Sequence, residues 1–111
     1  MPRDIKESDW KLFRRLHPVA LERFSKQVIE EINQATSNVS ENYHDRYLEV
    51  LRLIMDRDEE MGWAFNDVRR SQGIILLANI KESGLLTEEE FLQFSPETRE
   101  SVEVIIKVRR S

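Results

Sequence analysis

Apolar side chains in the first third of the chain recur every three or four residues, which is the spacing of one face of an α-helix. The row runs from Trp10 to Ala35, and Ser8 is a suitable N-cap with Asp9 in the first turn. Pro18 interrupts the row, because proline lacks a backbone N–H and restricts the residue before it. We therefore expect a helix over residues 8–35 with a kink or a short break at Pro18.

Small polar residues follow from Thr36 to Ser40 and predict a loop, with a second helix starting near Glu41. Beyond Tyr47 a row of positions alternates spacings of four and three, as a heptad seam does. The row consists of Tyr47, Leu51, Ile54, Asp58, Met61, Phe65, Val68, Gln72, Ile75 and Asn79. Most of these side chains are apolar, so the pattern predicts a helix face that packs against another element.

The pattern alone leaves open whether residues 41–83 form one helix or two. A single helix of that length would extend about 65 Å, whereas a compact chain of this size has a radius of gyration near 13 Å. A break near the acidic run Asp56–Glu60, at Gly62 or at Gly73 would give two shorter helices packed on each other. We favour the broken arrangement because helices of ordinary length are far more common.

The segment Ile74–Ile80 is apolar on nearly all sides of a helix, so we expect it at the centre of the core, with Gly84 ending that helix. Thr87 and Glu90 then form a capping box that starts a short helix at Glu88. The matching hydrophobic staple consists of Leu86 and Phe91.

Ser95 and Pro96 repeat this start signal as N-cap and first helical residue of a last helix. Together the patterns predict an all-α fold: one helical domain over residues 1–111, a bundle of four to five helices that ends in a capped pair of short helices. We expect residues 1–7 and 109–111 to fray.

Composition narrows the class of protein without naming a chemistry. The chain has no cysteine, which excludes disulfides and thiolate metal sites and favours a cytoplasmic location. Its longest uninterrupted apolar run, Ile74–Ala78, is far too short to cross a bilayer, so we expect no membrane partner. Residues 36–67 carry three basic and eight acidic side chains, and this acidic middle disfavours nucleic acid as a partner.

The densest acidic cluster raises the possibility of a divalent-metal site. Carboxylates of Glu49, Asp56 and Glu60, spaced along a helix, could hold the metal of a hydrolase acting on a phosphorylated small molecule. A calcium loop starting at Asp56 is excluded, because Met61 and Asp67 stand where glycine and glutamate are needed. A solvated acidic face is the ordinary interpretation of such a run, and we expect no cofactor.

Other signals of catalysis are weak. Glu41 and His44 have the i, i+3 spacing of di-iron carboxylate sites, but the chain lacks the second pair that such sites need. It also has no glycine-rich phosphate loop, nucleophile elbow or zinc signature. The sequence therefore favours a non-catalytic protein.

Arginine pairs form a third candidate site. Arg14 with Arg15 and Arg69 with Arg70 belong to different expected helices, as does the pair at residues 109 and 110. If the pairs converged, their guanidinium groups would bind phosphate or carboxylate in an anion or nucleic-acid site. The alternative is that neighbouring acids neutralise them on the surface.

The leading hypothesis is a non-catalytic protein-interaction or regulatory module that contacts a protein partner or a second copy of itself as a homo-oligomer. It depends on the wide apolar surface of the second helix, since monomers rarely expose large apolar patches. The residues expected at this interface are Tyr47, Leu51, Ile54, Met61, Trp63 and Phe65.

Overall fold

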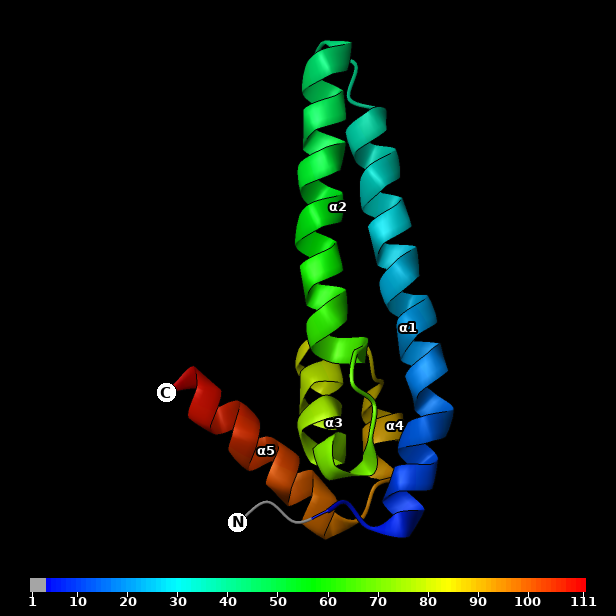
Figure 1. Cartoon of the computed structure of the whole chain (residues 1–111), viewed down its shortest axis with the longest axis vertical. Helices are drawn as coiled ribbons and strands as arrows, with labels where there is room; N and C mark the ends of the chain where they lie inside the picture. Colours follow the sequence, from blue (N-terminus) through cyan, green and yellow to red (C-terminus); the bar gives the residue numbers. More distant parts are fainter. Residues whose placement is uncertain (1–3) are drawn as a thin grey trace.

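The computed structural model describes residues 4–111 and is all-α, with no strand in that range. Its helices in chain order are α1 (Glu7–Thr36), α2 (Tyr43–Phe65), the 3-10 turn η1 (Arg70–Gln72), α3 (Gly73–Glu82), α4 (Glu88–Leu92) and α5 (Pro96–Arg110). Helices α1 and α2 lie side by side as a long antiparallel hairpin, and the three shorter helices gather at one end of it (Figure 1).

Of the kink or short break expected at Pro18, the break is absent, because α1 continues through this residue. Proline at this position removes the bond that the carbonyl of Arg14 would accept. Both residues are exposed on the outer side of α1, so water can satisfy that carbonyl and the helix is not interrupted.

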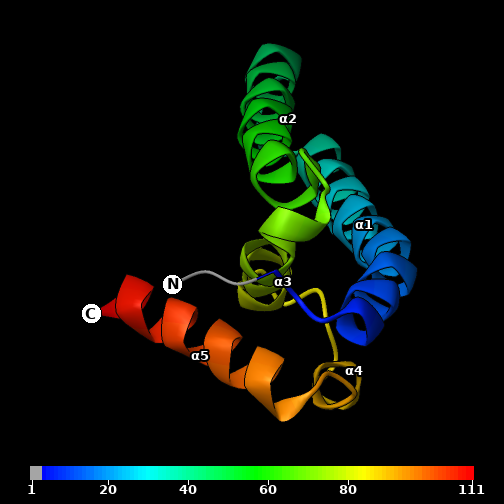
Figure 2. The ribbon, with the colours of Figure 1, turned by 60° about the horizontal axis from the view of Figure 1, so that its bottom comes forward.

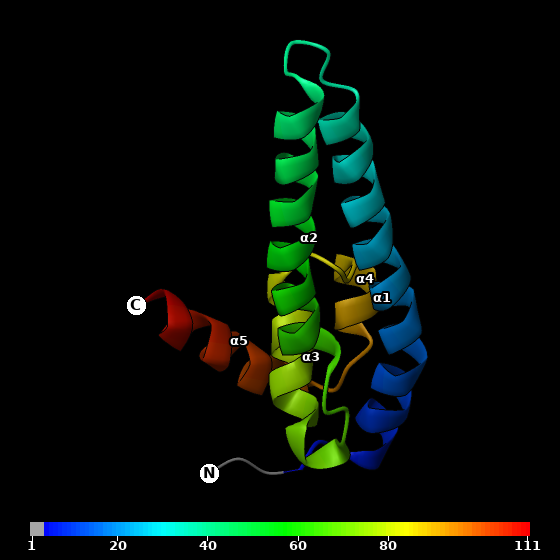
Figure 3. The same ribbon diagram turned by 45° about the horizontal axis from the view of Figure 1, so that its top comes forward.

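The favoured two-helix arrangement of residues 41–83 is confirmed. Helix α2 ends at Phe65, and the chain then passes through Asp67, whose φ of 56° is left-handed, before η1 and α3 begin. Figures 1 and 3 show this segment running past the end of α2 and returning as α3. At the start of α2, Asn42 is the N-cap, since its side-chain oxygen accepts a hydrogen bond from the backbone N–H of Asp45 at 2.8 Å.

The local signals of the second half are also confirmed. Gly84 adopts a φ of 74° after α3, and the N–H groups of Gly84 and Leu85 bond back to the carbonyls of Lys81 and Ile80. This is a Schellman motif, in which a left-handed glycine satisfies the last carbonyls of a helix. Thr87 forms the expected capping box before α4, and Pro96 is the first residue of α5.

The core lies where α1, α3, α4 and α5 meet the end of α2, a region that we call the base. Its centre is α3, where Leu77, Ala78 and Ile80 are almost completely buried, as the sequence predicts. Helix α5 packs across α3, and Figure 2 shows it leading away from the hairpin. The core residues contributed by α1 and by the last turn of α2 are Leu12, Phe13, Ala20, Phe24, Ala64 and Phe65.

The rest of the hairpin projects from the base. Among residues 25–63, which we call the arm, only Ala35 is buried. The molecule is accordingly elongated, measuring 52 × 28 × 23 Å with a radius of gyration of 16.7 Å, against about 13 Å for a compact chain of this length. No helix among residues 4–111 combines the length and apolarity needed to cross a bilayer.

Described residues near both ends contact the rest of the fold. Residues 1–3 lie outside the described range, but Ile5 is buried and its carbonyl accepts a hydrogen bond from Arg70 at 3.0 Å. Helix α5 continues to Arg110, and Arg109 pairs with Glu82 at 2.9 Å. Contacts with residues distant in sequence thus hold Ile5 and Arg109, and a local pattern cannot reveal such contacts.

Candidate functional site

Helix α2 carries apolar side chains on two neighbouring stripes, of which only one is covered by α1. The covered stripe contains Val50, Leu53 and Met61, which are partly buried between the two helices. The exposed stripe contains Tyr47, Leu51 and Ile54, with exposed fractions of 62%, 41% and 46%. In the arm, the heptad row predicted from the sequence therefore lies next to the surface of α2 that contacts α1. The row becomes buried only where α2 reaches the base.

The exposed stripe continues onto the neighbouring helix. Ile29 of α1 and Ile54 of α2 line the same cleft, and both are about half exposed. Met55 lies beside Ile54 and is 62% exposed. We call the set Ile29, Tyr47, Leu51, Ile54 and Met55 the apolar face of the arm.

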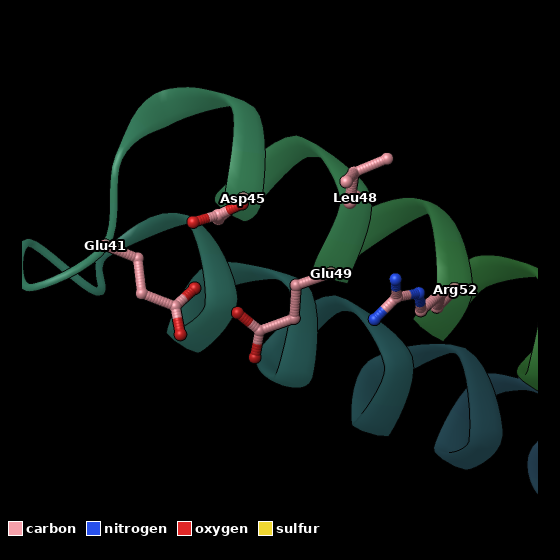
Figure 4. Close-up of a pocket in the computed structure, with 5 residues that line it drawn as sticks. All are labelled: Glu41, Asp45, Leu48, Glu49 and Arg52. Atoms are coloured by element: carbon pink, nitrogen blue, oxygen red, sulfur yellow. The ribbon is translucent and has the colours of Figure 1, made fainter.

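Charged side chains of the arm concentrate away from this face. Figure 4 shows a hollow beside α2 whose lining is mostly charged: Glu41, Asp45, Glu49 and Arg52, with Leu48 as its apolar member. Another cleft between the helices is lined by Gln27, Glu60 and other polar residues rather than by the exposed isoleucines. In the cleft of Ile29 and Ile54 the charged residues are Asp58 and Arg57, and Arg57 already pairs with Glu31 and Glu60.

Two of the expected interface residues contact the core: Met61 at the end of the arm and Phe65 in the base. Phe65 is buried, with its ring centroid 5.1 Å from that of His17 and 5.8 Å from that of Phe24. Met61 is partly buried and packs against the same core. Phe65, which we expected at the interface, is therefore a core residue of the single chain, because the stripe that is exposed in the arm is covered at the end of α2.

Trp63 is half exposed but does not belong to the apolar face. It lines the cleft that includes Gln27, Glu60 and Glu82. The guanidinium of Arg109 lies 5.4 Å from the centre of its ring, a cation–π contact within the chain. Trp63 thus has a partner in α5, and the interface predicted from the sequence divides into two separate places.

The candidate metal ligands do not form a site. Within residues 4–111, no three histidine, cysteine or acidic side chains come together in a way that could hold a metal ion. Glu49 lines one hollow beside Arg52, while Glu60 pairs with Arg57 in another. Asp56 is exposed on α2.

Half of the arginines in the three pairs are engaged with acidic residues. Arg69 pairs with Asp67 at 2.9 Å. Arg70 pairs with Glu7 at 3.1 Å, close to the start of α1. Arg14 and Arg15 are exposed and line a shallow hollow with Lys11. An anion site built from Arg14, Arg15, Arg69 and Arg70 stays a prediction.

Three polar groups of the base have surroundings that the sequence patterns did not predict. The first is Asp9, whose buried carboxylate accepts hydrogen bonds from the backbone and hydroxyl of Ser95 and from the hydroxyl of Thr98. Burial alone raises the pKa of Asp9, but these hydrogen bonds outweigh it and lower the pKa below its usual value. Asp9 therefore joins the start of α1 to the start of α5.

The second group is Arg23 of α1, which binds both carboxylate oxygens of Glu90 at 2.6 and 2.9 Å and the carbonyl of Leu85 at 2.9 Å. This bidentate pair lowers the pKa of Glu90 to about 2. The third group is His17, between the rings of Phe13 and Phe65, whose Nε2 has no hydrogen-bond partner. Burial lowers the pKa of His17.

Comparison of the chain with protein families, with curated proteins and with solved structures finds no match. Of the candidate sites, the apolar face has the clearest physical character: exposed apolar side chains on two long helices, with most charges directed elsewhere.

Proposed function

We propose that this protein is a non-catalytic interaction module that self-associates through the apolar face of the arm. The single observation that carries the proposal is the exposure of Tyr47, Leu51 and Ile54 on a stripe of α2 that α1 leaves uncovered. Large apolar side chains grouped on one face of a monomer are characteristic of protein–protein contacts. The absence of cysteine from the sequence supports a cytoplasmic setting for this association.

The architecture of the arm supports a helical partner. Two antiparallel helices with one apolar face uncovered are half of a four-helix bundle, and a second pair of helices completes such a bundle. A second copy of the chain supplies a pair of matching length. Most closed assemblies of soluble proteins are built in this way from identical subunits.

The test is the molecular mass of the untagged protein by native mass spectrometry and sedimentation. We expect an oligomer that Leu51→Glu converts to a monomer, because the new carboxylate would be buried against apolar side chains. Leu51 is 41% exposed, so the substitution leaves the base intact and circular dichroism should be unchanged.

Gln34→Glu is the matched control, since it places the same carboxylate at an exposed position of α1 outside the apolar face. It should leave the mass of the oligomer unchanged. A wild-type protein that stays monomeric at high micromolar concentration, or a folded Leu51→Glu variant of unchanged mass, contradicts the proposal.

A further inference from the structure

The exposed stripe of α2 has a symmetrical order of residues about Leu51. His44 lies seven positions before Leu51 and Asp58 lies seven positions after it. Tyr47 lies four positions before Leu51 and Met55 four positions after it. Leu48 lies three positions before Leu51 and Ile54 three positions after it. Positions separated in this way by three, four and seven residues lie on one stripe of a helix.

This order is self-complementary when two copies of α2 run antiparallel. A two-fold axis at Leu51 places each residue of one helix opposite its mirror position in the other. Leu51 then meets the Leu51 of a second copy, and Tyr47 meets Met55. His44 of each copy meets Asp58 of the other, so an imidazole N–H faces a carboxylate at both ends of the stripe.

A parallel pairing lacks this complementarity. It would set Asp58 against Asp58 and His44 against His44, which brings two carboxylates together within an apolar contact. Asp58 is exposed and has no ion pair among the described residues. The charge on the stripe therefore favours the antiparallel arrangement of two copies over the parallel one.

The length of the arm also accommodates the antiparallel pairing. Leu51 is eight residues from the start of α2 at Tyr43 and fourteen residues from its end at Phe65. At about 1.5 Å per residue, the start of one α2 reaches about 12 Å beyond the axis, whereas the base of the other copy begins about 21 Å away. The overlapping segments lie within residues 43–59, where no side chain is buried in the monomer.

We infer that two copies of this chain pair through antiparallel α2 helices about a two-fold axis at Leu51, with His44 of each copy bonded to Asp58 of the other. This inference rests on the proposed function and gives it a geometry. The two α1 helices flank the pair, since Ile29 extends the apolar face onto α1. The bases lie at opposite ends of the resulting four-helix bundle.

Disulfide cross-linking of the full chain tests the axis, because the natural sequence contains no cysteine. Leu51→Cys should give a covalent dimer under mild oxidation, since the two Cβ atoms meet at the axis within disulfide range. Arg52→Cys, at the next exposed position and on the charged side of α2, should not. Equal cross-linking of both variants would overturn the inference.

A mixture of two cysteine variants tests whether the two α2 helices run antiparallel or parallel. Tyr47→Cys mixed with Met55→Cys should give the mixed dimer in preference to either self-linked dimer. Self-linked Tyr47→Cys as the main product would show a parallel pairing and overturn the inference. A native dimer that none of these variants cross-links would overturn it as well, while leaving the proposed self-association standing. A monomeric native protein would overturn both.

The charge pair has its own test in an exact exchange of side chains. His44→Asp should raise the dissociation constant of the dimer about tenfold, because it sets like charges together at two symmetric places. The double variant His44→Asp with Asp58→His should restore affinity close to that of the wild type. A double variant as weak as His44→Asp alone would show that these residues do not meet.

Discussion

The base and the arm share the two long helices α1 and α2 but are stabilised in different ways. In the base, α1 and α2 meet α3 and bury large side chains such as Phe13 and Phe24. In the arm the two helices have only each other, and of residues 25–63 only Ala35 is buried. Each of two paired helices can cover at most one stripe of the other. Apolar surface therefore stays exposed in the two-helix arm, whereas the five helices of the base bury it.

The largest difference in unfolding free energy between base and arm should come from replacing an aromatic side chain with alanine in each region. Phe13 is 1% exposed and Tyr47 is 62% exposed, although both are aromatic residues on long helices. Phe13→Ala should lower the free energy of unfolding by about 3–5 kcal/mol, because it removes core contacts and leaves a cavity. Tyr47→Ala should change it by less than about 0.5 kcal/mol in the monomer. Urea denaturation at low protein concentration measures both, and similar losses would contradict the division into base and arm.

The next effect concerns Asp9, which has three hydrogen-bond donors in the base. Asp9→Ala should cost about 2–3 kcal/mol of unfolding free energy, because it leaves the hydroxyls of Ser95 and Thr98 without their acceptor. Asp45→Ala is the control, since Asp45 is an exposed carboxylate of the arm. A loss for Asp9→Ala no greater than that for the control would show that the tie between α1 and α5 contributes nothing.

Low pH should destabilise the five-helix core region, which we call the base, by protonating Glu90. The pKa of this carboxylate is about 2 in the folded protein and 4.5 without its partners. The depressed pKa means that its stabilising effect is full above pH 4.5 and is lost as the pH falls towards 2. After allowance for solvent around Arg23, the Arg23–Glu90 pair should contribute about 1–2 kcal/mol.

Glu90→Gln should remove that contribution at neutral pH and flatten the dependence of stability on pH between 4.5 and 2. The matched control is Glu89→Gln, an exposed residue of the same helix. Denaturation curves collected at several pH values provide the comparison. An unchanged pH dependence in Glu90→Gln would rule out the pair as the source.

The smallest effect should come from His17 at a higher pH. Burial lowers its pKa below 6.5, so the unfolded chain takes up the proton first and stability declines as the pH falls below about 6.5. The decline should be less than about 1 kcal/mol, because the side chain is only partly buried. His17→Phe should remove this dependence, whereas His44→Phe in the exposed arm should retain it. Thermal melts between pH 7 and 5 would show the difference.

The local elements of this fold could be predicted from the sequence because their signals are local. The capping box at Thr87, the glycine stop at Gly84 and the apolar segment Ile74–Ile80 each depend on neighbouring residues, and each appears in the structure. The continuity of α1 through Pro18 depends instead on the exposure of that side of the helix, which a pattern does not contain.

The candidate site could be predicted only in part, because the exposure of a side chain also depends on contacts that a local pattern does not contain. The sequence indicates that Tyr47, Leu51 and Ile54 share a stripe, and the structure shows that this stripe is exposed. It does not indicate where α1 stops covering α2, so Phe65 in the core and Trp63 beneath Arg109 were grouped with them. Ile29 was missed because it belongs to the other helix of the hairpin and joins the face only in three dimensions.

The tie between Asp9 and Thr98 spans 89 residues of sequence, and this has a consequence for synthesis on the ribosome. The core of the base contains residues of α5, so it cannot be completed until α5 has left the exit tunnel. During that interval a nascent chain presents its apolar stripe before its own core exists.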